Sequence, residues 1–144
     1  MKTCPVNAEE PRFLTLDQVL RLHRACLAKF GGIAGVRDSG LVESALASAK
    51  NTYFYGGGDV FDVAAAYAFH LAESQAFLDG NKRVGVSAAL AFLYINGWLL
   101  SENTAVLHRA MIDVANKVLN KPGLAELFRQ AAFSRSESTD TSTL

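Results

Sequence analysis

Two long apolar segments, separated by a short polar one, constrain the fold of this chain more than any other feature. Residues 60–72 and 84–95 consist mostly of Val, Ala, Leu, Phe, Tyr and Ile, so each segment is apolar on nearly all sides. Helices of that kind are buried, and the second run is too short to span a bilayer. We therefore predict two helices, roughly 59–76 and 82–95, that form the central antiparallel pair of an all-α bundle.

Capping residues and apolar spacing predict four further helices, which makes about six in total. Thr15 and Gln18 have the form of a capping box before an amphipathic run that Gly31 and Gly32 stop. Asp38 or Ser39 should cap a second helix, and Ser101 a fifth. We expect these helices to bury Leu41, Val42, Ala45, Leu46 and Ala49, then Leu107, Met111, Val114, Ala115 and Val118.

Pro122 and Gly123 are expected to precede a short sixth helix in which Leu124, Leu127, Phe128 and Ala131 pack. No segment shows convincing strand alternation. Residues 134–144 are rich in Ser and Thr without apolar periodicity, which is typical of a disordered tail. The sequence thus predicts one domain over residues 1–133, followed by a disordered tail over 134–144.

The polar segment between the two apolar runs has the composition of a phosphate-binding loop. Asp79 and Gly80 break the first run, and Asn81, Lys82 and Arg83 open the second at its N-terminus, where backbone N–H groups favour an anion. Lys82 and Arg83 would supply charge, and Asp79 is a hard oxygen ligand suited to Mg²⁺. Asn81 could orient a phosphate or the loop itself. The same residue types also fit an ordinary turn and a solvated helix start.

This loop resembles the motif of the Fic-domain superfamily, and in particular its death-on-curing (Doc) toxin branch. The family pattern is His-x-Phe-x-Asp/Glu-Gly/Ala-Asn, followed by Gly-Arg in adenylylating enzymes and by Lys-Arg in the Doc branch. Phe77, Asp79, Gly80, Asn81, Lys82 and Arg83 match that pattern in register. The resemblance extends over about residues 12–132 and includes segments 13–16, 22–23, 30–35, 37–41 and 90–97. It implies a Fic/Doc-like helical bundle.

One position departs from the family pattern. Gln75 occupies the place of the family histidine, which is taken to be the general base that accepts the proton of the attacking hydroxyl. A glutamine amide cannot accept that proton and can only orient the hydroxyl by hydrogen bonding. Neither His23 nor His70 is an obvious replacement: both are expected to be partly buried structural residues, whereas His108 should be solvated.

The resemblance implies a toxin of a toxin–antitoxin module that transfers phosphate from ATP, with Mg²⁺, to a protein hydroxyl. In the family the Lys-Arg branch is associated with phosphorylation of elongation factor Tu, which halts translation, whereas the Gly-Arg branch transfers AMP. The implied partners are a Phd-like antitoxin and that protein target. Three readings stay open: a phosphotransferase or AMP transferase, a nucleotide- or partner-binding module weakened by Gln75, and a purely structural domain.

Segment 51–58 combines three aromatic residues, Tyr53, Phe54 and Tyr55, with three glycines. Such a segment can be a packed connector or an exposed docking strand. In Fic-like proteins the corresponding segment is a flap beside the active loop that binds the target's extended backbone. The resemblance therefore favours a target-docking role for these three residues.

Composition limits the remaining possibilities. Lys and Arg total 14, as do Asp and Glu, so no net basic field favours direct binding of nucleic acid. The two cysteines, Cys4 and Cys26, are too few for a disulfide framework, and Cys26 should pack as a free thiol. No membrane association is expected, and the first residues lack the layout of a signal peptide. We expect a cytoplasmic protein.

Overall fold

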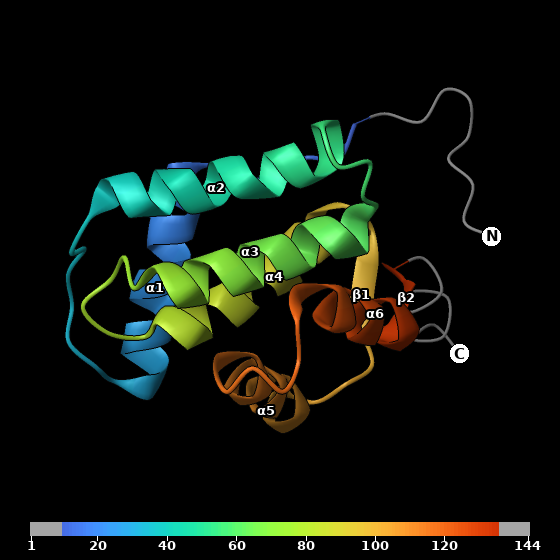
Figure 1. The fold of residues 1–144 in the computed structure, drawn as a ribbon. Helices are drawn as coiled ribbons and strands as arrows, with labels where there is room; N and C mark the ends of the chain where they lie inside the picture. Colours follow the sequence, from blue (N-terminus) through green and yellow to red (C-terminus); the bar gives the residue numbers. More distant parts are fainter. Residues whose placement is uncertain (1–9, 136–144) are drawn as a thin grey trace.

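The computed structural model describes residues 10–135, and this part of the chain contains six helices and one small sheet (Figure 1). The elements in chain order are α1 (Leu16–Phe30), α2 (Ser39–Phe54), α3 (Val60–Ser74), α4 (Asn81–Ile95), β1 (Trp98–Leu100), α5 (Thr104–Ala115), α6 (Lys121–Ala131) and β2 (Ala132–Ser134). This arrangement confirms the predicted all-α bundle. No helix among the described residues has the length and apolar character needed to cross a membrane.

The antiparallel pair α3 and α4 forms the centre of the bundle, as the two apolar runs predict (Figure 1). Both helices are buried along most of their length, including Tyr67 of α3 and Phe92 of α4. Gly85 allows a close approach, because a Cβ at that position would lie only 2.7 Å from the backbone oxygen of Ala68. Helices α2 and α6 pack against α3, α1 packs mainly against α4, and α5 contacts both α3 and α4.

Side-chain caps set the helix starts, although not always at the predicted residue. The capping box of Thr15 and Gln18 begins α1, and Asp38 caps α2 by accepting from Gly40 N–H and Leu41 N–H. Asn103, and not Ser101, caps α5, since its side chain accepts from Val106 N–H. Each of these caps satisfies backbone donors that have no partner within the helix.

Three predictions about the C-terminal third were wrong in detail. Ala115 and Val118 are exposed, because α5 ends at Ala115 and the chain then turns away. Pro122 does not precede the sixth helix but lies in its first turn, where the missing N–H costs nothing. In contrast, Leu124, Phe128 and Ala131 are buried as predicted.

A two-stranded antiparallel sheet, β1 paired with β2, was not predicted. It places Trp98 opposite Ser134 and Leu100 opposite Ala132. Strands of three residues are too short to show an alternating pattern, so the sequence carried no signal for them. Ser134 therefore belongs to the ordered fold, whereas residues 136–144 of the predicted disordered tail lie outside the described residues.

The aromatic segment is located far from the polar loop. Tyr53 and Phe54 form the last turn of α2 and contact the ring of Phe13, and exposed Tyr55 is the C-cap residue. The segment precedes α3, whereas the polar loop follows it, and a helix of 15 residues is about 22 Å long. These three residues therefore do not lie beside the loop: α2 continues as helix through Tyr53 and Phe54, and Tyr55 is its C-cap residue. A role for them in docking a target stays a prediction.

Candidate functional site

The polar loop runs from Gln75 to Gly80 and connects the central helices α3 and α4. Both of its end residues have left-handed backbone conformations, with φ of 55° at Gln75 and 76° at Gly80. Gly80 is the N-cap residue of α4 and has no side chain, so no side-chain cap binds the first backbone N–H groups of that helix. These N–H groups, at the positive end of the helix dipole, remain available to an anion.

Asn81 holds the loop in shape from within. Its side chain is 8% exposed; Oδ1 accepts from Phe77 N–H at 3.0 Å, and Nδ2 donates to Phe77 O at 3.0 Å. The same Nδ2 group lies 3.4 Å from Gln75 Oε1. Of the two roles that the sequence left open for Asn81, orienting the loop is the one that its contacts favour.

Asp79 is exposed, and its carboxylate is held by backbone donors. Oδ2 accepts from Ile33 N–H at 3.1 Å, and Oδ1 accepts from Gly80 N–H at 2.9 Å. These two hydrogen bonds lower the pKa of Asp79 below its usual value of 3.8, with smaller help from the charges of Arg83 and His23 against a small opposing effect of burial. Asp79 is therefore ionised at neutral pH.

A magnesium ion is compatible with this carboxylate. The described residues contain no group of three or more His, Cys, Asp or Glu side chains that could hold a metal alone. Magnesium bound with a nucleotide commonly takes only one or two carboxylates, and phosphate oxygens and water supply its other ligands. The single exposed Asp79 carboxylate, one residue before the helix N-terminus, provides that kind of donor.

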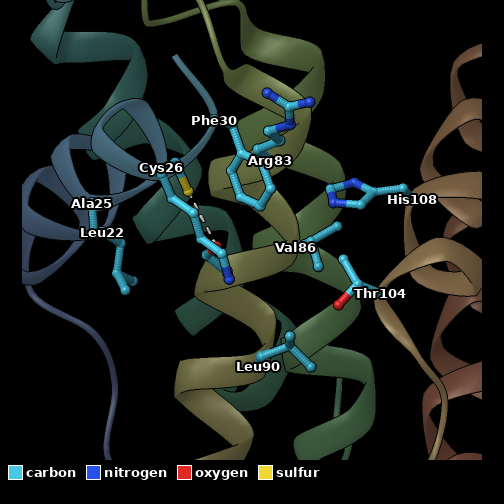
Figure 2. Close-up of a pocket in the computed structure, with 11 residues that line it drawn as sticks. Leu22, Ala25, Cys26, Phe30, Arg83, Val86, Leu90, Thr104 and His108 are labelled. Carbon is cyan, nitrogen blue, oxygen red and sulfur yellow. Dashed lines mark hydrogen bonds between the residues drawn. The ribbon is translucent and has the colours of Figure 1, made fainter. Parts of the chain in front are cut away.

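Lys82 and Arg83 are exposed in the first turn of α4. Together with Gln75, Leu78, Asp79, Gly80 and Asn81 they line a pocket of about 270 Å³. The guanidinium of Arg83 lies 4.4 Å from the ring centre of Phe30, over its face (Figure 2). Arg83 thus also borders a second pocket of about 230 Å³ between α1, α4 and α5, whose lining includes Cys26 and His108.

Gln75 is the C-cap residue of α3; it is exposed, but its side-chain amide forms hydrogen bonds within the protein. Nε2 donates to Ala72 O at 3.0 Å, while Oε1 accepts from Asn81. Its backbone oxygen accepts hydrogen bonds from both Nε and a terminal nitrogen of Arg37. The position that holds a histidine in the family pattern is therefore occupied here by a residue that caps a helix and supports the loop.

Residues 31–38, which join α1 to α2, lie along the loop and were missed as part of the site. Leu78 N–H donates to Gly35 O at 3.1 Å, Arg37 N–H donates to Ala76 O at 2.8 Å, and Val36 forms an isolated antiparallel bridge with Phe77. Ile33 and Val36 have exposed side chains. Gly31 and Gly32 were interpreted only as a helix stop, although glycines also mark close backbone approach. At Gly32 a Cβ would lie 2.8 Å from Asp79 Oδ2.

His23 also reaches the loop, which the sequence did not predict. It is buried in α1, as expected, but its ring stacks on Phe77 with centroids 3.9 Å apart, and Nε2 lies 2.7 Å from Asp79 O. Because a carbonyl oxygen can only accept, Nε2 must carry the proton. The sequence signal was a polar residue on the apolar stripe of an amphipathic helix.

The other histidines and the described cysteine are placed away from the loop's interior. His70 is half-buried with Lys121 Nζ 3.0 Å from its Nε2, and burial, followed by the charge of Lys121, lowers the pKa of His70. His108 is half-buried in the second pocket and not fully solvated as predicted; burial and then Arg83 lower its pKa. Cys26 is a buried free thiol, as predicted, whereas Cys4 lies outside the described residues.

Comparison with known proteins finds similarity over the part of the chain that contains this loop. The model of the Fic/DOC family matches residues 13–93, which is more than half of the chain and includes the loop. The chain is 32% identical over 87 residues to "Protein kinase doc" of Escherichia phage P1, covering 60% of this chain and 69% of that protein. It is 44% identical over 96 residues to "Toxin Doc" of Mycolicibacterium smegmatis, covering 64% of this chain and 71% of that protein.

Proposed function

The chain belongs to the Fic/DOC family, and on that basis we propose that it is a Doc-like toxin that transfers phosphate from ATP to a protein hydroxyl. One of its relatives carries the name protein kinase and another the name toxin, which supports both halves of this proposal. The observation that carries it is the uncapped N-terminus of α4, with the ionised carboxylate of Asp79 beside it and Lys82 in its first turn.

Each part of the loop has a defined task in this proposal. The free N–H groups of α4 and the ammonium of Lys82 bind phosphate oxygens, and Arg83 adds charge at the rim. Asp79 would hold Mg²⁺, which, when bound, neutralises phosphate charge during transfer. Asn81 and Phe77 keep these groups in position. Positioning and charge stabilisation are the main contributions of a protein to phosphoryl transfer.

The target would dock beside the loop along residues 31–38. This segment runs next to Phe77 and Leu78 and presents the exposed side chains of Ile33 and Val36. An extended backbone adds readily to a segment of this kind. We assign docking to residues 31–38 and not to Tyr53, Phe54 and Tyr55, because those aromatic residues lie at the opposite end of α3.

Gln75 makes the transfer slow in this proposal. Its amide can hydrogen-bond to the attacking hydroxyl but cannot take its proton at neutral pH. The same residue is the reason to keep a second candidate, a nucleotide- or partner-binding module with little transfer activity. Transfer of AMP is less favoured, because Lys82 adds bulk and charge where adenylylating relatives have glycine.

The proposed partners follow from the family. A toxin of this kind is expected to pair with a Phd-like antitoxin, and elongation factor Tu is the proposed target, so that phosphorylation would block translation. A cytoplasmic location is part of the same proposal. The balanced charge of the chain gives no reason to add nucleic acid as a partner.

Label transfer separates the candidates. The purified protein is incubated with Mg²⁺, elongation factor Tu and ATP that carries the label at either the γ or the α phosphate. Label from the γ position alone supports phosphotransfer, label from the α position supports AMP transfer, and nucleotide binding without either supports the binding module. Lys82→Ala should weaken ATP binding by about 1 to 3 kcal/mol, the range for a lost charge-assisted hydrogen bond. Unchanged affinity would contradict the phosphate-loop assignment.

A further inference from the structure

His23 of α1 contacts the loop in two ways. Its ring nitrogen Nε2 forms a hydrogen bond with Asp79 O, and its ring stacks on Phe77. Its side chain is almost completely buried, with a relative exposure of 3%. A polar group in such a place is retained only with a partner, and the partner here is a backbone oxygen of the loop itself. The contact joins residues 56 positions apart in the sequence.

The contact acts on the part of the loop where the proposed ligands would bind. Asp79 O accepts from His23 Nε2, and the same residue carries the carboxylate proposed to hold Mg²⁺. A Cβ at the next residue, Gly80, would lie 3.6 Å from His23 Nε2, so the imidazole also borders the turn that starts α4. The position of His23 therefore affects both the carboxylate and the open helix N-terminus.

The hydrogen bond has a further electrostatic consequence. Because Asp79 O accepts from His23, this oxygen points towards α1. If it pointed towards the phosphate site instead, its partial negative charge would repel the bound phosphate. At the other end of the loop Arg37 holds the backbone oxygen of Gln75 in a comparable way. The loop is thus held by side-chain donors from outside at both ends, by an exposed arginine at one and by a buried histidine at the other.

We propose that His23 is a positioning residue for Mg²⁺ and nucleotide, which holds Asp79 and Gly80 in the binding-competent arrangement through its hydrogen bond to Asp79 O and its stack on Phe77. The ligand named in this inference rests on the proposed function, whereas the effect of His23 on the loop does not depend on it. His23 does not touch the reacting atoms, and it acts as a donor through Nε2–H. Without the bond the loop would spend less time in the competent arrangement, and the apparent affinity would fall in proportion.

Three variants separate this role from simple core packing. His23→Phe keeps a flat ring for Phe77 but removes the donor, so the Asp79 carbonyl loses its hydrogen bond to α1. His23→Gln keeps an amide donor at a reach similar to that of Nε2 but removes the ring. Val19→Ala is the matched control, since Val19 lies one turn earlier in α1, is completely buried and makes no hydrogen bond to the loop through its side chain.

Two measurements are made on each full-length variant. The first is hydrogen exchange, by NMR without nucleotide, of the amides of Phe77 and Leu78, which donate to Asn81 and Gly35. The second is the dissociation constant for Mg²⁺–ATP. His23→Phe should speed exchange of both loop amides and weaken Mg²⁺–ATP binding by about tenfold, the order of effect of losing one hydrogen bond that holds the loop. His23→Gln should recover most of the affinity, and Val19→Ala should lower the melting temperature without either loop effect.

The proposal is wrong if His23→Phe matches the wild type in loop exchange and Mg²⁺–ATP affinity. It is also wrong if Val19→Ala produces the same loop effects at an equal loss of melting temperature, because His23 would then act through general stability alone. Failure of the proposed function is distinguishable: the wild type would not bind Mg²⁺–ATP, while the exchange measurement would still show whether His23 holds the loop.

Discussion

The residues of the motif divide into those that hold the loop and those that face solvent. Phe77 and Asn81 are buried, and the side chain of Asn81 hydrogen-bonds to the backbone of Phe77. Asp79, Lys82 and Arg83 are exposed. The sequence could predict the second group, because charged residues at a helix start suggest anion binding without a structure. It could not assign the role of Asn81, which depends on a hydrogen-bond geometry that exists only in the folded loop.

Gln75→His should raise transfer to the target by about 100-fold or more, the usual contribution of a placed general base. The left-handed conformation at this position suits the change, since histidine is enriched there among residues other than glycine. The gain should appear in turnover and not in ATP affinity, and it should decline at acidic pH as the imidazole takes up a proton. Turnover and binding are measured on both proteins across pH 5 to 8.

Two outcomes would change the interpretation of Gln75. If the wild type already matched a histidine-bearing relative in rate, the proton would have to leave to phosphate or solvent. If Gln75→His stayed inactive while nucleotide still bound, the loss of activity would involve more than one residue, and the binding module would become the better description.

Asp79→Asn should weaken the dependence of nucleotide binding on Mg²⁺. The amide keeps the size of the side chain but removes the charge that attracts the ion, and only one of its two polar atoms can accept from Ile33 N–H or Gly80 N–H. Calorimetric titration of ATP with and without Mg²⁺ measures the difference. An unchanged Mg²⁺ dependence would mean that the carboxylate only supports the turn and the contact with residues 31–38.

At the level of elements, the sequence predicted helices well and connections poorly. The starts of α1 and α2 and the central pair followed from caps and apolar runs, which are local properties. The alignment of residues 31–38 with the loop could not be predicted, because it is a pairing between segments about 40 positions apart that includes only one isolated bridge. The helical end of α2 was missed because aromatic residues and glycines there suggested a loop.

The close contact between α3 and α4 at Gly85 leaves no room for a larger side chain. In Gly85→Ala the new Cβ would approach the backbone oxygen of Ala68, which cannot rotate away as a side chain could. The helices would have to move apart, and we expect a net loss of about 1 to 3 kcal/mol in the free energy of unfolding, despite the better helix propensity of alanine.

Urea denaturation measures the effect of Gly85→Ala. Ser44→Ala is the control, because that exposed position on α2 should change stability by less than about 0.5 kcal/mol. Equal or higher stability in Gly85→Ala would show that the central pair has room for the methyl group.

For the whole molecule, one cluster of ion pairs ties the C-terminal helix to the centre. Arg129 of α6 donates to both carboxylate oxygens of Asp59, at 3.1 and 3.0 Å, and lies 3.4 Å from Asp62. Asp59 is also the N-cap residue of α3, where it accepts from Phe61 N–H and Asp62 N–H. The last helix of the described residues is therefore attached to the start of the helix that leads to the loop.

The pH dependence of this attachment follows from Asp59. Burial raises the pKa of Asp59, but the hydrogen bonds from Arg129 and Asp62 and the charge of Arg129 outweigh it, so the pKa lies below 3.8. A carboxylate with a lowered pKa in the folded state contributes stability above its unfolded pKa, and this contribution is lost as the pH falls through the folded value. The Arg129–Asp59 pair should therefore be fully effective at neutral pH.

Arg129→Gln should lower the free energy of unfolding by about 1 kcal/mol at pH 7, a modest value because the partly exposed side chains are screened by solvent. The deficit relative to the wild type should stay constant from pH 8 to 5 and begin to shrink below about pH 3.8, the ordinary pKa that Asp59 has in the unfolded chain. It should be lost as the pH falls through the lower pKa of the folded state. Urea denaturation over this range measures it. Arg109→Gln is the control, since Arg109 is much more exposed than Arg129 and its pair with Asp113 lies within α5, so it should contribute almost nothing. A deficit that persisted unchanged at pH 3 would instead assign the stabilisation to the packing of Arg129 over the ring of Phe61, 5.7 Å away.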